Sequence, residues 1–169
     1  TKKLGFYKKT RNGLIGTDYS SKFSPWLANG SISARTIYWN VKKFEKEEIK
    51  NQSTYWLIFE LIWRDYFKYI SLKHGNNIFK IGGILNKNYA WSSNRKIIQN
   101  WINGETKDDF VNANMIELKK TGWMSNRGRQ NVASYFAKEL TLDWRIGAAY
   151  FESTLLDYDV HSNFGNWMY

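Results

Sequence analysis

The sequence predicts an all-α helical bundle, and three observations support this prediction. Alternation of apolar and polar residues, which is typical of half-buried β-strands, is scarce along the 169 residues. Residues that cap helices precede most of the apolar stretches, and glycines follow several of them. The hydrophobic content of 43% is sufficient for a sizeable core, so a single helical domain is expected over residues 1–169.

The first fifty residues contain signals for two helices. Residues 1–24 are polar, basic and contain glycines, so a loop is expected there. The first helix is expected to begin at Ser24 and Pro25, because serine caps helices and proline suits their first position. A second helix is expected over residues 34–44. Residues 42–50 mix charges of both signs, which is typical of a solvated helix end.

The longest helix is expected to begin with Thr54 as its cap and to continue to about residue 73, where Gly75 ends it. The glycines and asparagines of residues 75–93 indicate an irregular connection. Gly122 is expected to break the chain, and residues 157–169 are expected to form a loop. Further helices are expected over residues 95–103, 111–120, 126–140 and 143–156.

The composition excludes several classes of protein and leaves others open. The chain has no cysteine, so disulfides and thiolate metal sites are excluded. We expect no membrane span and no signal peptide, because no long apolar segment is present and none follows the lysines of residues 1–5. The net charge of +10 attracts phosphate polyanions, and the 18% of aromatic residues can stack on bases or on a flat cofactor. A basic protein with a bulky aromatic core explains the same composition.

One face of the helix expected over residues 54–73 combines charged and aromatic side chains. Glu60 and Arg64 lie on it with Trp63 and Phe67, at the i, i+3, i+4 and i+7 positions. An exposed i,i+4 ion pair contributes only about 0.3–0.5 kcal/mol. Charges within an apolar stripe are costly unless they are satisfied. A structural ion pair and a bound polar ligand explain this face equally well.

Three more segments carry polar clusters. Residues 122–129 place two arginines and Asn126 around glycines, which suits phosphate or a polar ring edge but also a basic helix start. Asp157, Asp159 and Asn163 can bond to the edge of a heterocycle or form a turn, and they do not follow the EF-hand pattern. Residues 18–24 combine hydroxyl groups with the start of a helix, which suits phosphate. His74 and His161 lie far apart in the sequence, and no metal site is expected.

In order and spacing, these segments resemble the FAD-binding domain of the photolyase/cryptochrome family. The resemblance extends from about Tyr7 to Tyr169 and implies the helical bundle of that domain with FAD as its cofactor. The strings that carry it most strongly are residues 59–66 (FELIWRDY), 122–129 (GWMSNRGR), 142–145 (LDWR) and 155–167 (LLDYDVHSNFGNW).

The resemblance implies a role for individual residues. Among the catalytic positions, Glu60 matches the carboxylate that touches a pyrimidine dimer, Trp63 the wall of the dimer pocket, and Asn163 the residue that faces flavin N5. Asn126 matches a residue beside the flavin and the substrate pocket. The electron-transfer positions fall on Trp167 nearest the flavin, Trp144 in the middle and Trp91 at the surface. The cofactor-binding positions fall on Tyr7, Ser20, Ser21, Lys22, Phe23, Ser24, Arg64, Arg129, Asp157, Tyr158, Asp159 and Asn163.

At two positions the sequence resembles the DASH branch of the family more than the other branches. Tyr169 stands where many duplex-repairing photolyases have a tryptophan in the dimer pocket, and Gln130 also fits the DASH pattern. A less hydrophobic pocket favours dimers in single-stranded DNA, where extruding a base costs less. The chain departs from the family in residues 107–115, which lack the usual proline and have Asn112 in place of an aspartate.

The resemblance implies repair of cyclobutane pyrimidine dimers, driven by blue light through electron transfer from reduced flavin. The expected partner is dimer-containing DNA, single-stranded by preference, and a monomer in the cytoplasm is expected, or in an organelle or the nucleus of a eukaryote. A folate-type antenna chromophore is expected only in a full-length protein with the α/β antenna domain of the family, which is not in this sequence. Two alternatives are a blue-light receptor that uses the same FAD site and a basic nucleic-acid-binding module without flavin.

Overall fold

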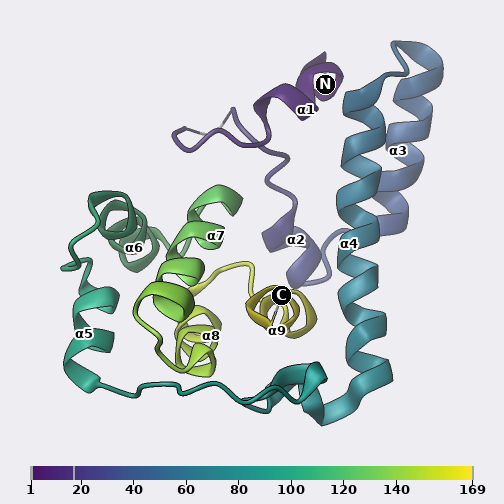
Figure 1. Cartoon of the computed structure of the whole chain (residues 1–169). Helices are drawn as coiled ribbons and strands as arrows, with labels where there is room; N and C mark the ends of the chain where they lie inside the picture. The colour runs from purple at the N-terminus through teal and green to yellow at the C-terminus, as the bar shows by residue number, and fades with distance from the viewer. Residues whose placement is uncertain (1, 17, 169) are drawn as a thin grey trace.

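The computed structural model describes residues 2–16 and 18–168, and no β-strand occurs among them (Figure 1). This confirms the all-α prediction. The main chain of Ser92 forms an isolated parallel bridge with Leu142. The α-helices are α1 (Tyr7–Thr10), α2 (Ser24–Ala28), α3 (Ala34–Glu47), α4 (Gln52–His74), α5 (Arg95–Asn103), α6 (Asp109–Thr121), α7 (Asn126–Ser134), α8 (Trp144–Thr154) and α9 (Val160–Met168). Short 3-10 turns cover Lys2–Phe6, Gly75–Phe79 and Gly83–Leu85, and a π-helical turn covers Tyr135–Glu139.

Side-chain caps fix the beginnings of the two long helices. The side chain of Ser33 accepts a hydrogen bond from the backbone N–H of Thr36 at 3.0 Å and begins α3. The cap of α4 is Asn51, whose side chain accepts from the backbone N–H groups of Ser53 and Thr54. The prediction of Thr54 as the cap was therefore wrong by one turn. Thr54 is the N3 residue of a capping box, in which its hydroxyl accepts from the N–H of Asn51.

Three other boundaries differ from the prediction. Residues 2–10 form helical turns and not the expected loop. The backbone N–H of Lys8 donates to the Ser53 hydroxyl and holds these turns against α4. The last segment is α9 and not a loop, because Asp159 accepts from the N–H of Ser162 as helix caps do. The helix expected over residues 126–140 ends as an α-helix at Ser134 and continues as the π-helical turn.

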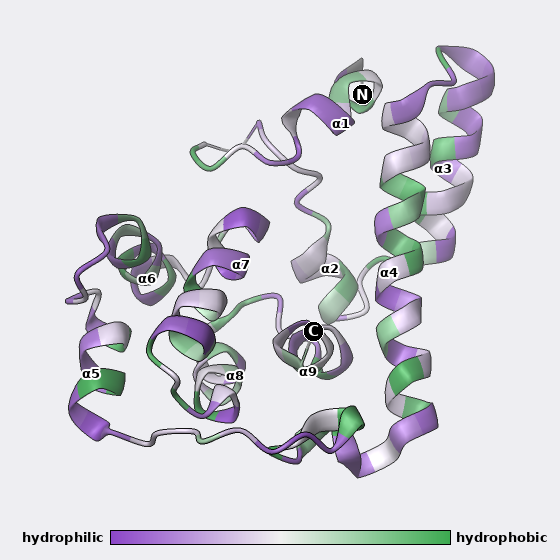
Figure 2. Cartoon of the chain, in the orientation of Figure 1, coloured by the Kyte–Doolittle hydropathy of each residue, from purple (hydrophilic) through white to green (hydrophobic). Residues whose placement is uncertain are grey.

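The side chains form two hydrophobic clusters. The N-terminal cluster lies between α1, α3 and α4 and contains Tyr7, Ile37, Val41, Leu57 and Leu61. The larger C-terminal cluster is built by α5 to α9 and includes several fully buried side chains, namely Trp101, Met115, Leu118, Met124 and Phe136. In Figure 2, hydrophobic and hydrophilic residues alternate in bands along α4, as expected of a helix with one buried side.

The C-terminal helix α9 connects the two halves of the molecule. It contacts both α4 and α8, and Figure 1 shows it between them. The approach to α4 is close at Gly165, where an added Cβ atom would lie 2.3 Å from Cδ1 of Phe67. No helix within residues 2–16 and 18–168 is both long and apolar enough to cross a membrane.

Candidate functional site

A central cavity of about 550 Å³ opens between α1, α2, α4, α7 and the beginning of α9. This volume is in the range of cofactor sites, roughly 300–1,000 Å³. Residues from both ends and the middle of the sequence meet there. The predicted site residues that line the cavity are Tyr7, Ser20, Ser21, Phe23, Ser24, Glu60, Trp63, Arg64, Asn126, Arg129, Asp157 and Asp159. Twelve positions chosen from the sequence are therefore brought together by the fold.

Three predicted cofactor residues lie outside the lining of this cavity. Lys22 lies in an adjoining cavity, with its ammonium group 4.5 Å from the ring centroid of Trp123. Tyr158 packs against the C-terminal cluster, where burial and the charge of Glu152 raise its pKa to about 12. Asn163 is buried, and its side-chain amide donates to the backbone carbonyl of Ala148 at 3.0 Å. The assignment of these three residues to FAD stays a prediction.

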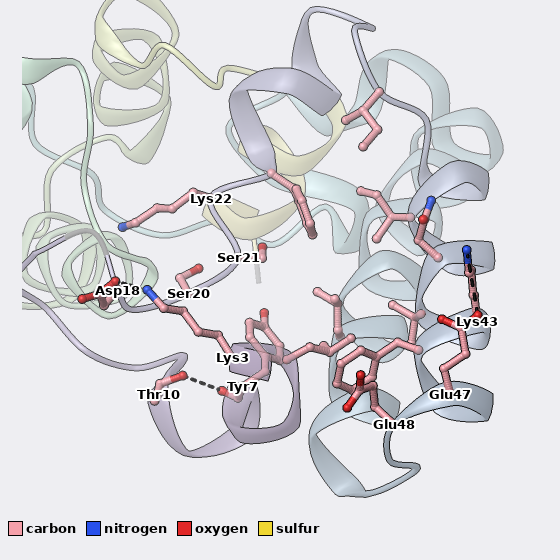
Figure 3. A pocket seen from close by; sticks show the side chains of 18 residues that line it. Lys3, Tyr7, Thr10, Asp18, Ser20, Ser21, Lys22, Lys43, Glu47 and Glu48 are labelled. Carbon is pink, nitrogen blue, oxygen red and sulfur yellow. Dashed lines mark hydrogen bonds and ion pairs between the residues drawn. The ribbon is translucent and has the colours of Figure 1, made fainter. Parts of the chain in front are cut away.

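The adjoining cavity, of about 790 Å³, lies on the other side of the serine-containing loop. Figure 3 shows the hydroxyl group of Tyr7 directed toward the segment that carries Ser20 and Ser21, with Glu47 and Glu48 on the far rim. Ser20 has a φ angle of 65° and Lys22 one of 57°, which are left-handed values that few non-glycine residues adopt. Such conformations concentrate at ligand sites, because the surroundings must hold them in place.

Glu60 forms an ion pair with a residue that the sequence did not indicate. Its carboxylate lies 2.5 Å from the guanidinium of Arg11, and the pair considered between Glu60 and Arg64 does not form. Arg64 extends toward the C-terminal segment, and its Nη2 lies 3.9 Å from the Asp159 carboxylate. The side chain of Glu60 is one-third exposed, at 32%. Burial raises the pKa of this carboxyl, and the charge of Arg11 opposes the rise.

Arg129 and Asp157 form a buried ion pair at the C-terminal wall of the central cavity. Nη2 of Arg129 donates to both carboxylate oxygens of Asp157 at 2.9 Å, and its Nε donates to the carbonyl of Met124 at 2.9 Å. The side chain of Asp157 is only 2% exposed. The two residues therefore neutralise each other and join α7 to the segment before α9.

The donors that face the central cavity fit a flat cofactor with phosphate groups. Trp56 adds a further aromatic side chain to the lining. The hydroxyl and guanidinium groups of the lining suit phosphate, and the rings of Phe59 and Trp63 suit an aromatic system. Polar and ring-binding groups are thus present together, as FAD requires.

The three predicted electron-transfer residues line a different cavity, of about 780 Å³, on the C-terminal side. Trp167 and Trp144 are buried, with exposures of 9% and 5%, whereas Trp91 is half-buried. The indole N–H of Trp144 donates to the carbonyl of Ile81 at 3.0 Å. The three residues share one cavity, and both their order and their roles stay predictions.

The sequence analysis missed three residues that line the central cavity, namely Arg11, Trp56 and Trp123. Arg11 lies in a stretch interpreted as loop, and Trp56 gave no signal beyond its aromatic character. Trp123 lies inside the quoted GWMSNRGR string and could have been found from it. Asn112, which departs from the family pattern, bonds to the main chain of Thr106 through both its carbonyl and its amide and holds the turn before α6. Tyr169 lies outside the described residues.

Comparisons with known proteins agree with this geometry. Residues 56–169 match the family described as the FAD binding domain of DNA photolyase. The chain is 57% identical over 169 residues to "Cryptochrome DASH" of Danio rerio, covering 100% of this chain and 32% of that protein. It is also 57% identical over 167 residues to "Cryptochrome DASH" of Synechocystis, covering 99% of this chain and 34% of that protein.

Solved structures show the same fold. A cryptochrome of Synechocystis superposes with a TM-score of 0.97 at 57% identity, covering 98% of this chain and 34% of that one. A bacterial class III photolyase from Agrobacterium tumefaciens superposes with a TM-score of 0.90 at 30% identity, with the same coverage of 98% and 34%.

The helical fold and the central cavity define an FAD-binding domain of the photolyase/cryptochrome type. The chain belongs to the DNA photolyase FAD-binding domain family, and its named relatives include DASH cryptochromes. This confirms the resemblance read from the sequence. The chain spans about a third of the length of these relatives.

Proposed function

We propose that this chain is the FAD-binding part of a flavoprotein that splits cyclobutane pyrimidine dimers in blue light, with dimers in single-stranded DNA as preferred substrates. The observation that carries the proposal is the central cavity. It places Glu60, Trp63 and Asn126, the residues expected to touch a dimer, beside the side chains expected to hold FAD. The relatives named photolyase and cryptochrome DASH support the same class of activity.

The hydroxyl groups of Tyr7, Ser20, Ser21 and Ser24 would hold the phosphates and ribose of FAD, with Arg64 balancing negative charge. When bound, FAD supplies the light-driven one-electron chemistry of dimer splitting. The protein contributes the binding and orientation of the reacting groups and the exclusion of water.

Glu60 and Trp63 have distinct tasks in the dimer pocket. The carboxylate of Glu60, ion-paired with Arg11, would accept a hydrogen bond from an N–H of the dimer. Arg11 fixes the position of that carboxyl through the ion pair at 2.5 Å. The ring of Trp63 provides an apolar wall against which a flipped base packs.

The cost of extruding the dimer, and not the charge of the chain, sets the preference for single strands. A net charge of +10 attracts the phosphate backbone of either form of DNA. A dimer in a duplex must first be extruded, which costs a few kcal/mol, and this cost is smallest in a single strand. We therefore expect faster repair of single-stranded substrates at the same salt concentration.

The proposal is tested by loading the chain with FAD and irradiating it with oligonucleotides that contain one thymine dimer. Dimer loss in single strands, slower loss in duplexes and slower loss with Glu60→Gln are the expected results. Glu105→Gln is the matched control, because Glu105 is exposed and lies outside the lining of the central cavity.

Two outcomes would overturn the proposal. Bound FAD with no splitting, together with light-dependent binding of a partner protein, would indicate a photoreceptor. The lack of any flavin absorption band after loading would indicate a nucleic-acid-binding module without flavin.

A further inference from the structure

Trp167 packs against aromatic residues that the predicted electron-transfer chain does not include. Its ring centroid lies 6.4 Å from that of Trp101, 5.9 Å from that of Phe136 and 5.2 Å from that of Phe151. Indole loses an electron far more readily than the benzene ring of phenylalanine. Of these three neighbours, Trp101 is therefore the one that can return an electron to an oxidised Trp167.

A tyrosine continues this contact toward the surface. The ring of Tyr150 lies 5.7 Å from that of Trp101, centroid to centroid, and the residue is half-buried. Tyr150 follows Trp144 by six positions on α8, which is about 240° around the helix axis. The path through Trp101 and Tyr150 thus leaves Trp167 on a different side of α8 from the path through Trp144.

The hydrogen bonds assign different tasks to the two residues. Trp101 is fully buried, and its indole N–H donates to the carbonyl of Val132 at 3.2 Å. A backbone carbonyl is not a base, so an oxidised Trp101 keeps its proton and acts as a relay. A tyrosine phenol, with an ordinary pKa of about 10, is protonated before electron transfer, and the half-buried Tyr150 can release its proton to water.

We propose that Trp101 and Tyr150 form a second electron-transfer branch to Trp167, in addition to the expected branch through Trp144 and Trp91. The inference rests on the FAD binding of the proposed function, because the oxidant would be a photoexcited oxidised flavin. With FAD bound, Trp167 would give one electron to the flavin, Trp101 would supply one electron to Trp167, and Tyr150 would supply one electron to Trp101. Tyr150 also loses its phenolic proton to water, which leaves a neutral tyrosyl radical.

The test is electron paramagnetic resonance of the FAD-loaded chain, frozen under blue light, with and without ring-deuterated tyrosine. In a Trp144→Phe background, where the expected branch is blocked, a tyrosyl signal that narrows on deuteration should persist. Adding Tyr150→Phe should remove it, and circular dichroism checks the fold of this variant, which retains the ring at a half-buried position. Tyr69→Phe, at an exposed tyrosine of α4, should leave the signal unchanged.

Each outcome bears on either the branch or the proposed function. A tyrosyl signal that survives Tyr150→Phe, or the loss of all protein radicals in Trp144→Phe alone, overturns the branch. Trp101→Phe should also remove the tyrosyl signal in the Trp144→Phe background, with circular dichroism as the check of its fold. Radicals that persist unchanged in Trp167→Phe would also overturn the branch, whereas a chain that binds no flavin contradicts the proposed function itself.

Discussion

Replacement of Gly147 by alanine tests the contact on which Trp167 depends. Both residues are buried, and an added Cβ atom would lie 2.3 Å from Cη2, 2.7 Å from Cζ3 and 2.9 Å from Cζ2 of the indole. Overpacking of this kind costs about 1–3 kcal/mol, whereas alanine in place of glycine within a helix gains about 1 kcal/mol. With clashes this short the cost is near its upper end, so the free energy of unfolding should fall by about 1–2 kcal/mol.

Urea unfolding followed by circular dichroism measures this change as a lower midpoint at an unchanged slope. The matched background is Trp167→Phe, which removes the far edge of the indole. In that background Gly147→Ala should be neutral or stabilising, because only the gain in helix propensity remains. The coupling energy between Gly147→Ala and Trp167→Phe should be about 1–3 kcal/mol, as for residues in direct contact. Equal effects of Gly147→Ala in both backgrounds would refute the reasoning.

Three further predictions concern ion pairs, caps and pH. Asp157→Ala leaves the charge of Arg129 unpaired in a largely buried setting and should lower the free energy of unfolding by about 3 kcal/mol. The control Asp65→Ala, at an exposed position, should change the free energy of unfolding little. Equal losses in the two variants would contradict the role of the ion pair. Asn51→Ala removes the cap of α4 and should lower the midpoint of urea unfolding by an amount equivalent to about 1 kcal/mol, and an unchanged midpoint would disprove the assigned cap. Because the folded pKa of Glu60 lies above 4.5, the folded state binds the proton more tightly, and stability from this group should fall as pH rises from 4.5 through the folded pKa. Glu60→Gln should remove that part of the slope, and identical pH profiles of unfolding for the two proteins would count against it.

Some helix beginnings were predictable from local caps, but Ser24, the expected cap of α2, lies inside that helix, whose N-cap is Phe23 and has no side-chain capping bond. Ser33 caps α3, the side chain of Asp143 accepts from the N–H of Arg145 at the beginning of α8, and both helices begin within one residue of the expected positions. The helical turns of residues 2–10 were missed because no cap marks them. Contacts with α4 hold them instead, including a hydrogen bond from the Asn51 amide to the carbonyl of Gly5 at 3.0 Å.

The choice of ion-pair partners was not predictable, because it depends on packing between segments that are distant in the sequence. Glu60 and Arg64 lie one turn apart, yet each has its nearest ionic partner elsewhere, at Arg11 and Asp159. The residue types at the site were nevertheless correct, since family motifs preserve side-chain chemistry and its order. Asp159 illustrates the remaining ambiguity, because the same carboxylate lines the cavity and caps α9.

The position of the central cavity between two separate hydrophobic clusters couples ligand supply to protein abundance. Tyr7, Leu57 and Leu61 line it from the N-terminal cluster, and Met124 lines it from the C-terminal cluster. A ligand at 100 times its dissociation constant adds about 2.7 kcal/mol to stability when it binds only the folded chain. Chains made during cofactor scarcity would therefore open more often and be degraded sooner, so a cell short of flavin would hold less of this protein as well as less of its active form.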